Sequence, residues 1–85
     1  PKRVVPEIFD LNDEEYEGCF NLVKDVKEFL KKEFNPDGFN LGVNCGETAG
    51  QTVFHAHIHV IPRYKGDVPN PRGGIRHVIP GKGNY

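Results

Sequence analysis

The stretch QTVFHAHIHVI, residues 51–61, decides the architecture of this chain. It is rich in β-branched and aromatic residues and a proline follows it, so it predicts a strand over residues 53–61. Successive side chains of a strand point to opposite faces, which places three histidines on one face: His55, His57 and His59. The apolar residues between them are expected to face a core: Phe54, Ala56, Ile58 and Val60.

Upstream of this stretch, residues 13–34 carry the pattern of an amphipathic helix. Apolar residues recur there at every third or fourth position. Asn12 is a suitable N-cap, and Glu15 stands where a capping box needs it. Turn residues end the helix, and residues 39–44 then alternate between apolar and polar as in a strand. The sequence therefore predicts an α+β domain with one long helix packed on an antiparallel sheet.

The two ends of the chain predict little regular structure. Two prolines and a Val-Val pair favour an extended lead over residues 1–10. Glycine and proline are frequent in residues 66–85, which predicts an irregular tail without a further helix.

The composition bounds the function. The chain has 85 residues, 11 basic and 12 acidic side chains, and a formal net charge of −1, which argues against bulk nucleic acid or an anionic membrane as partner. No apolar run approaches the length of a membrane-spanning helix, and two cysteines are too few for a disulfide framework. These features favour a cytoplasmic protein.

Two chemistries use such a row of imidazoles. One is metal binding, in which two histidines of a strand converge on one ion. The other is phosphoryl or nucleotidyl transfer, in which one imidazole attacks phosphorus and another protonates the leaving group. The preceding loop, residues 45–52, supplies glycines, hydroxyls and amides suited to an anion-binding nest. Carboxylates at metal-ligand spacing are sparse, so phosphate chemistry is favoured.

The alternation His-φ-His-φ-His-φ-φ, with φ apolar, resembles the signature of the histidine triad (HIT) superfamily. The resemblance extends outward to Asn44, to the segment AGQT before the triad and to PRYKGD after it. This context is similar to bacterial HIT hydrolases and to the fragile-histidine-triad-like branch. Pro1-Lys2-Arg3 resembles the end of the strand that precedes the long helix in the family. The chain is then expected to be the C-terminal part of a single HIT domain.

The resemblance also implies roles for individual residues. His57 matches the nucleophile, which forms a transient nucleotidyl-imidazole. His59 matches the triad member that contacts phosphate oxygens and the leaving group. His55 matches the first member, whose backbone carbonyl receives the second ring nitrogen of the nucleophile. Three further residues match positions that bind the α-phosphate or the bridging oxygen: Asn44, Gln51 and Thr52. Gly50 is expected to allow the substrate to approach the backbone closely. Val4 stands where many relatives have another histidine behind the triad.

The implied reaction is hydrolysis at the α-phosphorus of a dinucleoside polyphosphate or a nucleoside phosphoramidate. No essential cofactor is expected, and a divalent cation is expected only together with substrate. A homodimer is the implied assembly, and the alternating residues Phe39, Leu41 and Val43 are compatible with a subunit interface. Two alternatives stay open, namely a nucleotide-binding module with little catalysis and a metal site on the histidine strand.

Overall fold

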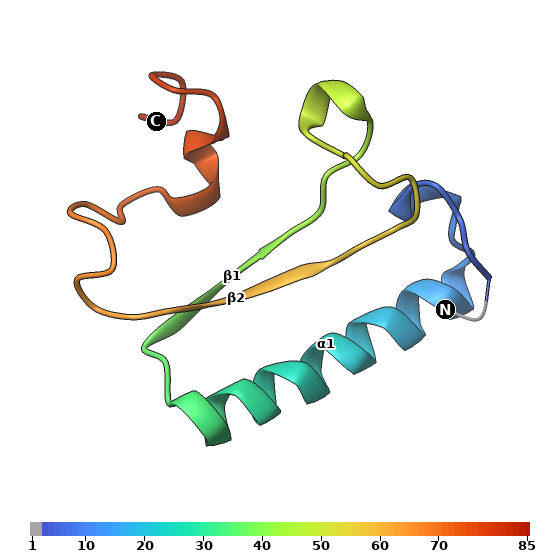
Figure 1. The fold of residues 1–85 in the computed structure, drawn as a ribbon, viewed down its shortest axis with the longest axis horizontal. Helices are drawn as coiled ribbons and strands as arrows, with labels where there is room; N and C mark the ends of the chain where they lie inside the picture. Colours follow the sequence, from blue (N-terminus) through green and yellow to red (C-terminus); the bar gives the residue numbers. More distant parts are fainter. Residues whose placement is uncertain (1–2) are drawn as a thin grey trace.

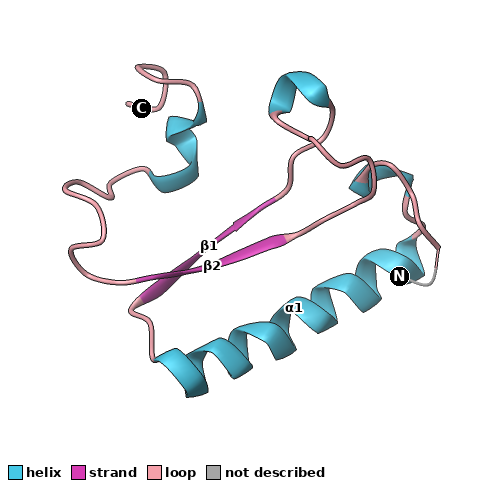
Figure 2. Ribbon diagram, viewed as in Figure 1, coloured by secondary structure: helices cyan, strands magenta, loops and turns pink. Residues whose placement is uncertain are grey.

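The computed structural model describes residues 3–85, so Pro1 and Lys2 of the Pro1-Lys2-Arg3 element lie outside the described residues. The described chain is one long helix against a two-stranded antiparallel sheet, joined and flanked by loops (Figures 1 and 2). The elements in order are η1 (Ile8–Asp10), α1 (Asp13–Phe34), β1 (Gly38–Gly42), η2 (Glu47–Ala49), β2 (His59–Arg63) and η3 (Gly74–Val78).

Helix α1 occupies the range expected from the sequence, because its ends are encoded locally. The Asn12 side chain accepts a hydrogen bond from the Glu15 N–H at 2.8 Å, and the Glu15 carboxylate accepts one from the Asn12 N–H at 2.9 Å. This capping box satisfies two of the N–H groups that a helix start leaves unpaired. At the other end Asn35 adopts the left-handed conformation with φ 46°, and its N–H bonds the Lys31 carbonyl.

The sheet is shorter than expected. Strand β1 pairs with β2 from Gly38 opposite Arg63 to Gly42 opposite His59. The prediction of a strand over residues 53–61 is wrong for residues 53–58, which have no sheet partner, while β2 continues two residues further, to Arg63. A strand needs a neighbour to hydrogen-bond, and β1 ends where the loop after Gly42 begins.

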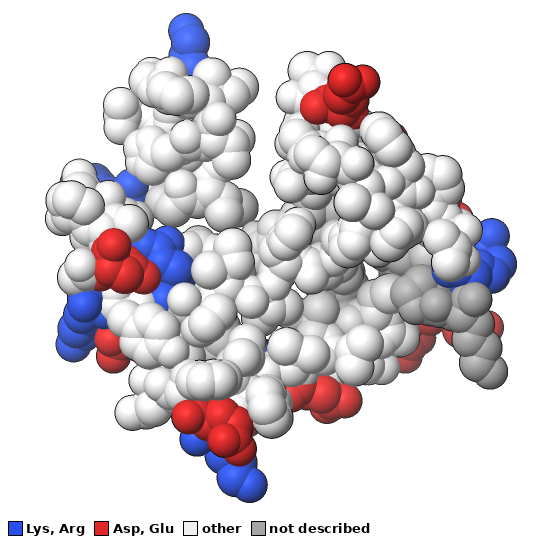
Figure 3. Space-filling view, in the orientation of Figure 1, with Lys and Arg blue, Asp and Glu red and all other residues white. Residues whose placement is uncertain are grey.

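The regions predicted to be irregular contain short 3₁₀ helices. η1 lies in the expected extended lead, η2 in the loop before the histidines, and η3 in the tail that was expected to have no helix. Gly73, with φ 90°, starts η3 in a conformation that only glycine adopts freely. The loop with η2 and the C-terminal residues both rise from the side of the sheet opposite α1 (Figure 1). A notch separates these two lobes in the space-filling view (Figure 3).

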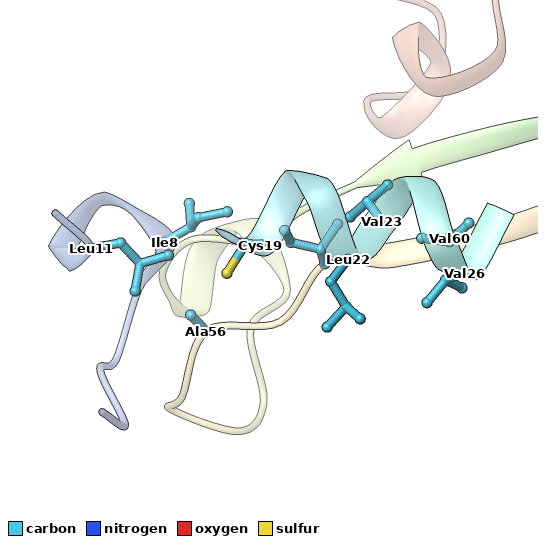
Figure 4. Close-up of a pocket in the computed structure, with 9 residues that line it drawn as sticks. Ile8, Leu11, Cys19, Leu22, Val23, Val26, Ala56 and Val60 are labelled. Carbon is cyan, nitrogen blue, oxygen red and sulfur yellow. The ribbon is translucent and has the colours of Figure 1, made fainter. Parts of the chain in front are cut away.

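The core is small and lies at the N-terminal end of α1. Val5, Ile8 and Leu11 form its buried apolar cluster, and six partly buried residues pack against them: Tyr16, Cys19, Val43, Cys45, Ala56 and Ile58. An apolar groove of about 300 Å³ continues from this core between α1 and the segment that leads into β2 (Figure 4). Its walls include Cys19, Val23 and Val26 of the helix and Ala56, Ile58 and Val60 of that segment.

The helix stripe and the strand face are therefore only partly covered. No α1 residue is fully buried. Phe20, Phe29 and Phe34, which are among the apolar residues that recur every third or fourth position, are exposed, because a two-stranded sheet covers little of a 22-residue helix. Ala56, Ile58 and Val60 face inward as predicted. Phe54 does not, since 58% of its surface is exposed at a bend outside the sheet.

Among residues 3–85 no helix is both long enough and apolar enough to span a membrane.

Candidate active site

A hollow of about 220 Å³ brings together six of the seven residues that the sequence singled out. Its lining consists of Asn44, Gly50, Gln51, Thr52, Val53, His57 and His59. We call it the histidine hollow. Three segments build it. Asn44 follows β1, residues 50–53 follow η2, and His57 and His59 lie just before and at the start of β2. Val53 belongs to the lining although sequence reasoning placed it only on a strand.

The three imidazoles lie along one side of the chain even though only His59 belongs to a strand. The ring centroids of His55 and His57 are 4.8 Å apart, and the rings are tilted by 32°. The rings of His57 and His59 are 6.4 Å apart and inclined by only 18°. All three side chains are exposed. Two neighbouring imidazoles therefore face the same solvent-accessible hollow.

His55 lies in a second, adjoining hollow of about 130 Å³, which Arg3, Val4, Val5 and Ala56 also line. The lead segment is fixed there by the Ala56 N–H, which donates to the Val5 carbonyl at 2.7 Å. Val4, where the HIT resemblance leads one to expect a further histidine, thus lines the same hollow as His55. An isopropyl group offers no hydrogen bond to that ring.

The loop before the histidines uses much of its backbone internally. Gly46 and Gly50 have φ of 88° and 95°, which glycine adopts without the penalty that other residues incur. The N–H groups of Ala49 and Gln51 donate to the Gly46 carbonyl, and that of Gly50 donates to the carbonyl of Glu47. These three N–H groups are therefore not free to bind an anion, and the prediction of an anion-binding nest is wrong for them.

Gln51 is the one buried polar residue of the described chain, with 6% of its surface exposed. Its Nε2 donates to the carbonyls of Pro6 at 2.6 Å and Val53 at 3.1 Å. Its Oε1 accepts from the Gly46 N–H at 2.8 Å. Gln51 lines the hollow as expected, yet its amide atoms join the lead, the loop and the histidine segment. Nothing local in the sequence signals this, because Pro6 is 45 residues away.

The Arg63–Asp67 ion pair lies outside the histidine hollow, whose lining contains neither residue. The Arg63 guanidinium binds both Asp67 carboxylate oxygens at 2.7 Å, and this hydrogen bonding holds the pKa of Asp67 well below its usual range. Arg63 also donates to the Asn40 side chain. Its charge is therefore already neutralised at the far end of β2.

Metal binding by the histidine row gains no support from the geometry. Within residues 3–85, no group of three or more His, Cys, Asp and Glu side chains is placed to hold a metal ion. The hollow instead collects two imidazoles, an Asn amide and a Thr hydroxyl. Such groups suit a substrate whose phosphate oxygens accept hydrogen bonds and whose phosphorus accepts a nucleophile.

The fold and this hollow define an α+β domain with a histidine-lined site. The HIT domain family model matches residues 1–66, and the chain belongs to the HIT family. A bis(5'-adenosyl)-triphosphatase of Dictyostelium discoideum is 41% identical over 70 residues, which are 82% of this chain and 47% of that protein. An asymmetrical bis(5'-nucleosyl)-tetraphosphatase of Schizosaccharomyces pombe is 42% identical over 67 residues, which are 79% of this chain and 37% of that protein.

Solved structures agree with the fold. The crystal structure of a HIT family protein from Bacillus anthracis superposes with a TM-score of 0.73 at 50% identity, over 78% of this chain and 47% of that one. The chain thus spans 37–47% of the length of these three relatives.

Proposed function

We propose that the protein is a nucleotide hydrolase that acts on dinucleoside polyphosphates through a covalent nucleotidyl-His57 intermediate. The observation that carries the proposal is the pairing of the His57 and His59 rings, 6.4 Å apart, in one hollow with Asn44 and Thr52. Similarity to a triphosphatase and a tetraphosphatase of dinucleosides supports the substrate class. Nucleoside phosphoramidates are a second substrate class with the same reacting atom.

In the proposed first step, the unprotonated ring nitrogen of His57 attacks the α-phosphorus. A P–N bond forms and the bond between the α-phosphorus and the bridging oxygen breaks. The leaving phosphate chain takes a proton from the neighbouring imidazole, His59. In the second step water attacks the same phosphorus and gives a proton to His59, the P–N bond breaks, and a nucleoside monophosphate leaves while both imidazoles return to their starting state.

The surrounding residues divide into two roles under this proposal. The Asn44 amide and the Thr52 hydroxyl donate hydrogen bonds to the phosphate oxygens on which charge develops. Gly50 lets the substrate approach the backbone, since no atom lies within 4 Å of the place where a Cβ would stand. Gln51 acts mainly as a positioning residue, because its amide holds the loop against Pro6 and Val53. His55 contributes its backbone carbonyl to orient the His57 ring.

We also propose that the working protein is a homodimer in the cytoplasm and needs no resident cofactor, with any divalent cation arriving with the substrate. The partly covered sheet face supports an interface, because Leu41 is 44% exposed between the half-buried Phe39 and Val43. Sedimentation equilibrium at micromolar concentration tests the assembly. A mass of one chain at every concentration would rule out the dimer.

The proposed activity is tested by turnover of a dinucleoside triphosphate and a tetraphosphate by the wild-type protein and by His57→Ala. We expect nucleoside monophosphate release from the wild type and a loss of at least about a thousandfold in the variant, as for other nucleophile deletions. Nucleotide binding without turnover by the wild type would instead establish the binding module. Activity that a chelator abolishes in the absence of added cations would favour the metal site.

A further inference from the structure

The C-terminal tail differs in charge from the rest of the chain. Residues 68–85 contain Arg72, Arg76 and Lys82 and no Asp or Glu, which gives their side chains a formal charge of +3. The other 67 residues hold eight basic and twelve acidic side chains, a charge of −4. The tail also lies beyond residues 1–66, which the HIT family model matches. A concentrated positive charge on an acidic chain points to an anionic partner.

The tail folds around a polar hollow of about 350 Å³, which we call the tail hollow. Its lining residues are all polar or aromatic: Asn70, Arg72, Arg76, His77, Asn84 and Tyr85. The apolar residues of the tail do not line it; Ile75, Val78 and Ile79 are exposed elsewhere. The hollow is thus lined with hydrogen-bond donors and cations.

Close packing at two glycines fixes the walls of the tail hollow. A Cβ on Gly73 would come within 2.5 Å of His77 Nε2, and one on Gly83 within 2.6 Å of His77 Nδ1. The imidazole therefore lies between two glycines, and its Nε2 contacts the Arg72 carbonyl at 2.6 Å. This packing brings the last residues back onto η3, where the guanidinium of Arg76 lies 4.6 Å over the ring of Tyr85.

The two arginines of the tail hollow lack anionic partners. The ion pairs found among residues 3–85 involve Arg3, Lys27 and Arg63, and neither Arg72 nor Arg76 joins one. Arg76 Nε is buried and has no hydrogen-bond partner within the described part of the chain. A buried donor without an acceptor is costly, and the cost is larger for a charged group. Arg76 Nε is closed off from the hollow, so an anion there would pair with the charges of the two guanidinium groups, neither of which has an ion-pair partner among the described residues.

Phosphate oxygens fit this set of donors. A guanidinium presents parallel N–H groups that bind two oxygens of one phosphate, and side-chain amides such as those of Asn70 and Asn84 donate to others. The ring of Tyr85 lies over the face of the Arg76 guanidinium, so hydrogen bonds to phosphate would come from its terminal N–H groups. We propose that the tail hollow is a phosphate-binding site.

Two sources can supply that phosphate. One is free inorganic phosphate or pyrophosphate, and the other is the distal phosphates of a polyphosphate substrate, an extension that rests on the proposed function. The tail lobe and the lobe with η2 rise from the same side of the sheet, and the notch of Figure 3 separates them. A polyphosphate chain that starts at the histidine hollow would leave the sheet on this side.

Inorganic pyrophosphate is the probe for the site itself, measured by calorimetry with the full chain at low and at physiological salt. We expect Arg76→Gln and Arg72→Gln each to weaken binding at least tenfold. Lys82→Gln is the matched control, since it removes the same charge from the tail without touching the hollow. Unchanged binding in both arginine variants, or an equal loss in the control, would overturn the proposal.

Amide chemical shifts, measured by NMR as pyrophosphate is added, test the site even if an arginine variant unfolds. They also distinguish binding in the tail hollow from binding in the histidine hollow. In the wild-type protein and in His57→Ala, pyrophosphate should move the signals of Gly73, His77 and Gly83. Shifts confined to residues 44–52 would overturn the proposal. Neither measurement needs turnover, so an inactive protein would defeat the proposed function and leave the tail site standing.

The source is decided by kinetics with active protein. If the substrate chain reaches the tail hollow, Arg76→Gln raises KM for a dinucleoside tetraphosphate several-fold more than for a triphosphate, and kcat stays within twofold. If the site takes free phosphate, Arg76→Gln leaves both KM values unchanged, although the wild-type protein binds pyrophosphate in the tail hollow. Either result supports a phosphate site and assigns its ligand.

Discussion

The Gln51 side chain donates a 2.6 Å hydrogen bond to the carbonyl of Pro6, and so links the histidine-bearing segment to a residue 45 positions earlier. The same amide bonds Val53 and Gly46. Together with the Ala56–Val5 hydrogen bond, it holds the lead against the loop. The position of His57 therefore depends on long-range hydrogen bonds as well as on the sheet.

Replacing Gln51 by Ala should cost about 1–3 kcal/mol of unfolding free energy, because it removes three hydrogen bonds made by a buried side chain. Urea denaturation followed by circular dichroism measures the change. Thr48→Ala is the matched control, since Thr48 is an exposed residue of the same loop. A Gln51→Ala protein as stable as Thr48→Ala would contradict the positioning role of this amide.

Removal of the helix cap tests the local origin of α1. Asn12→Ala should lower the unfolding free energy by about 1 kcal/mol, because the Glu15 N–H loses its acceptor. Asn12→Asp keeps an oxygen acceptor and should stay close to the wild type. Thermal denaturation of the three proteins decides, and equal midpoints for Ala and Asp would show that this cap does not stabilise the fold.

Two Gly→Ala substitutions should act in opposite directions. Gly18 lies inside α1 with open space around a new Cβ, so Gly18→Ala should stabilise the protein by about 0.5–1 kcal/mol. Gly50 has the same open space but a φ of 95°, so Gly50→Ala should destabilise it by about 1 kcal/mol or more. Changes of the same sign in urea titrations would contradict the loop conformation.

Acid should weaken the attachment of the lead to α1. The hydrogen-bonded Arg3 guanidinium, helped by the Asn12 N–H, lowers the pKa of Glu15 to about 2. Because the folded pKa is below the unfolded value, the stabilisation is complete above about pH 4.5 and is lost as the pH falls toward 2. Arg63 lowers the pKa of Asp67 in the same direction, which adds to the loss.

Glu15→Gln isolates the first of these two contributions. Its unfolding free energy should depend less on pH between 4.5 and 2 than that of the wild type. Glu14→Gln removes the same charge one residue earlier in an exposed position and should keep the wild-type dependence. Parallel pH curves for all three proteins would show that the Arg3–Glu15 pair does not form in solution.

Local signals were sufficient to predict the long helix and one shared side for the histidines. Asn12 and Glu15 mark the start of α1 within four residues. The spacing of His55, His57 and His59 places them on one side of an extended chain whether or not a partner strand is present. These features depend on neighbours in the sequence, which is why the structure agrees with them. The HIT resemblance likewise rests on contiguous motifs, and the family match confirms it.

Features that depend on distant contacts could not be predicted. The alternation of residues 53–58 resembles a strand, yet no partner pairs with them among the described residues, and Phe54 is consequently exposed. The nest of free N–H groups failed because a 3₁₀ turn uses them internally. The buried amide of Gln51 depends on Pro6, and no periodicity or motif relates two residues so far apart.

Trapping of a covalent intermediate is the sharpest test of the proposal that His57 attacks phosphorus. Protein is mixed with a dinucleoside triphosphate, quenched in alkali within milliseconds to protect a P–N bond, and mapped by peptide mass spectrometry. We expect a nucleotidyl group on His57 in the wild type and in His55→Ala, and none in His57→Ala. An actively hydrolysing protein without that adduct, or undiminished turnover in His57→Ala, would contradict it.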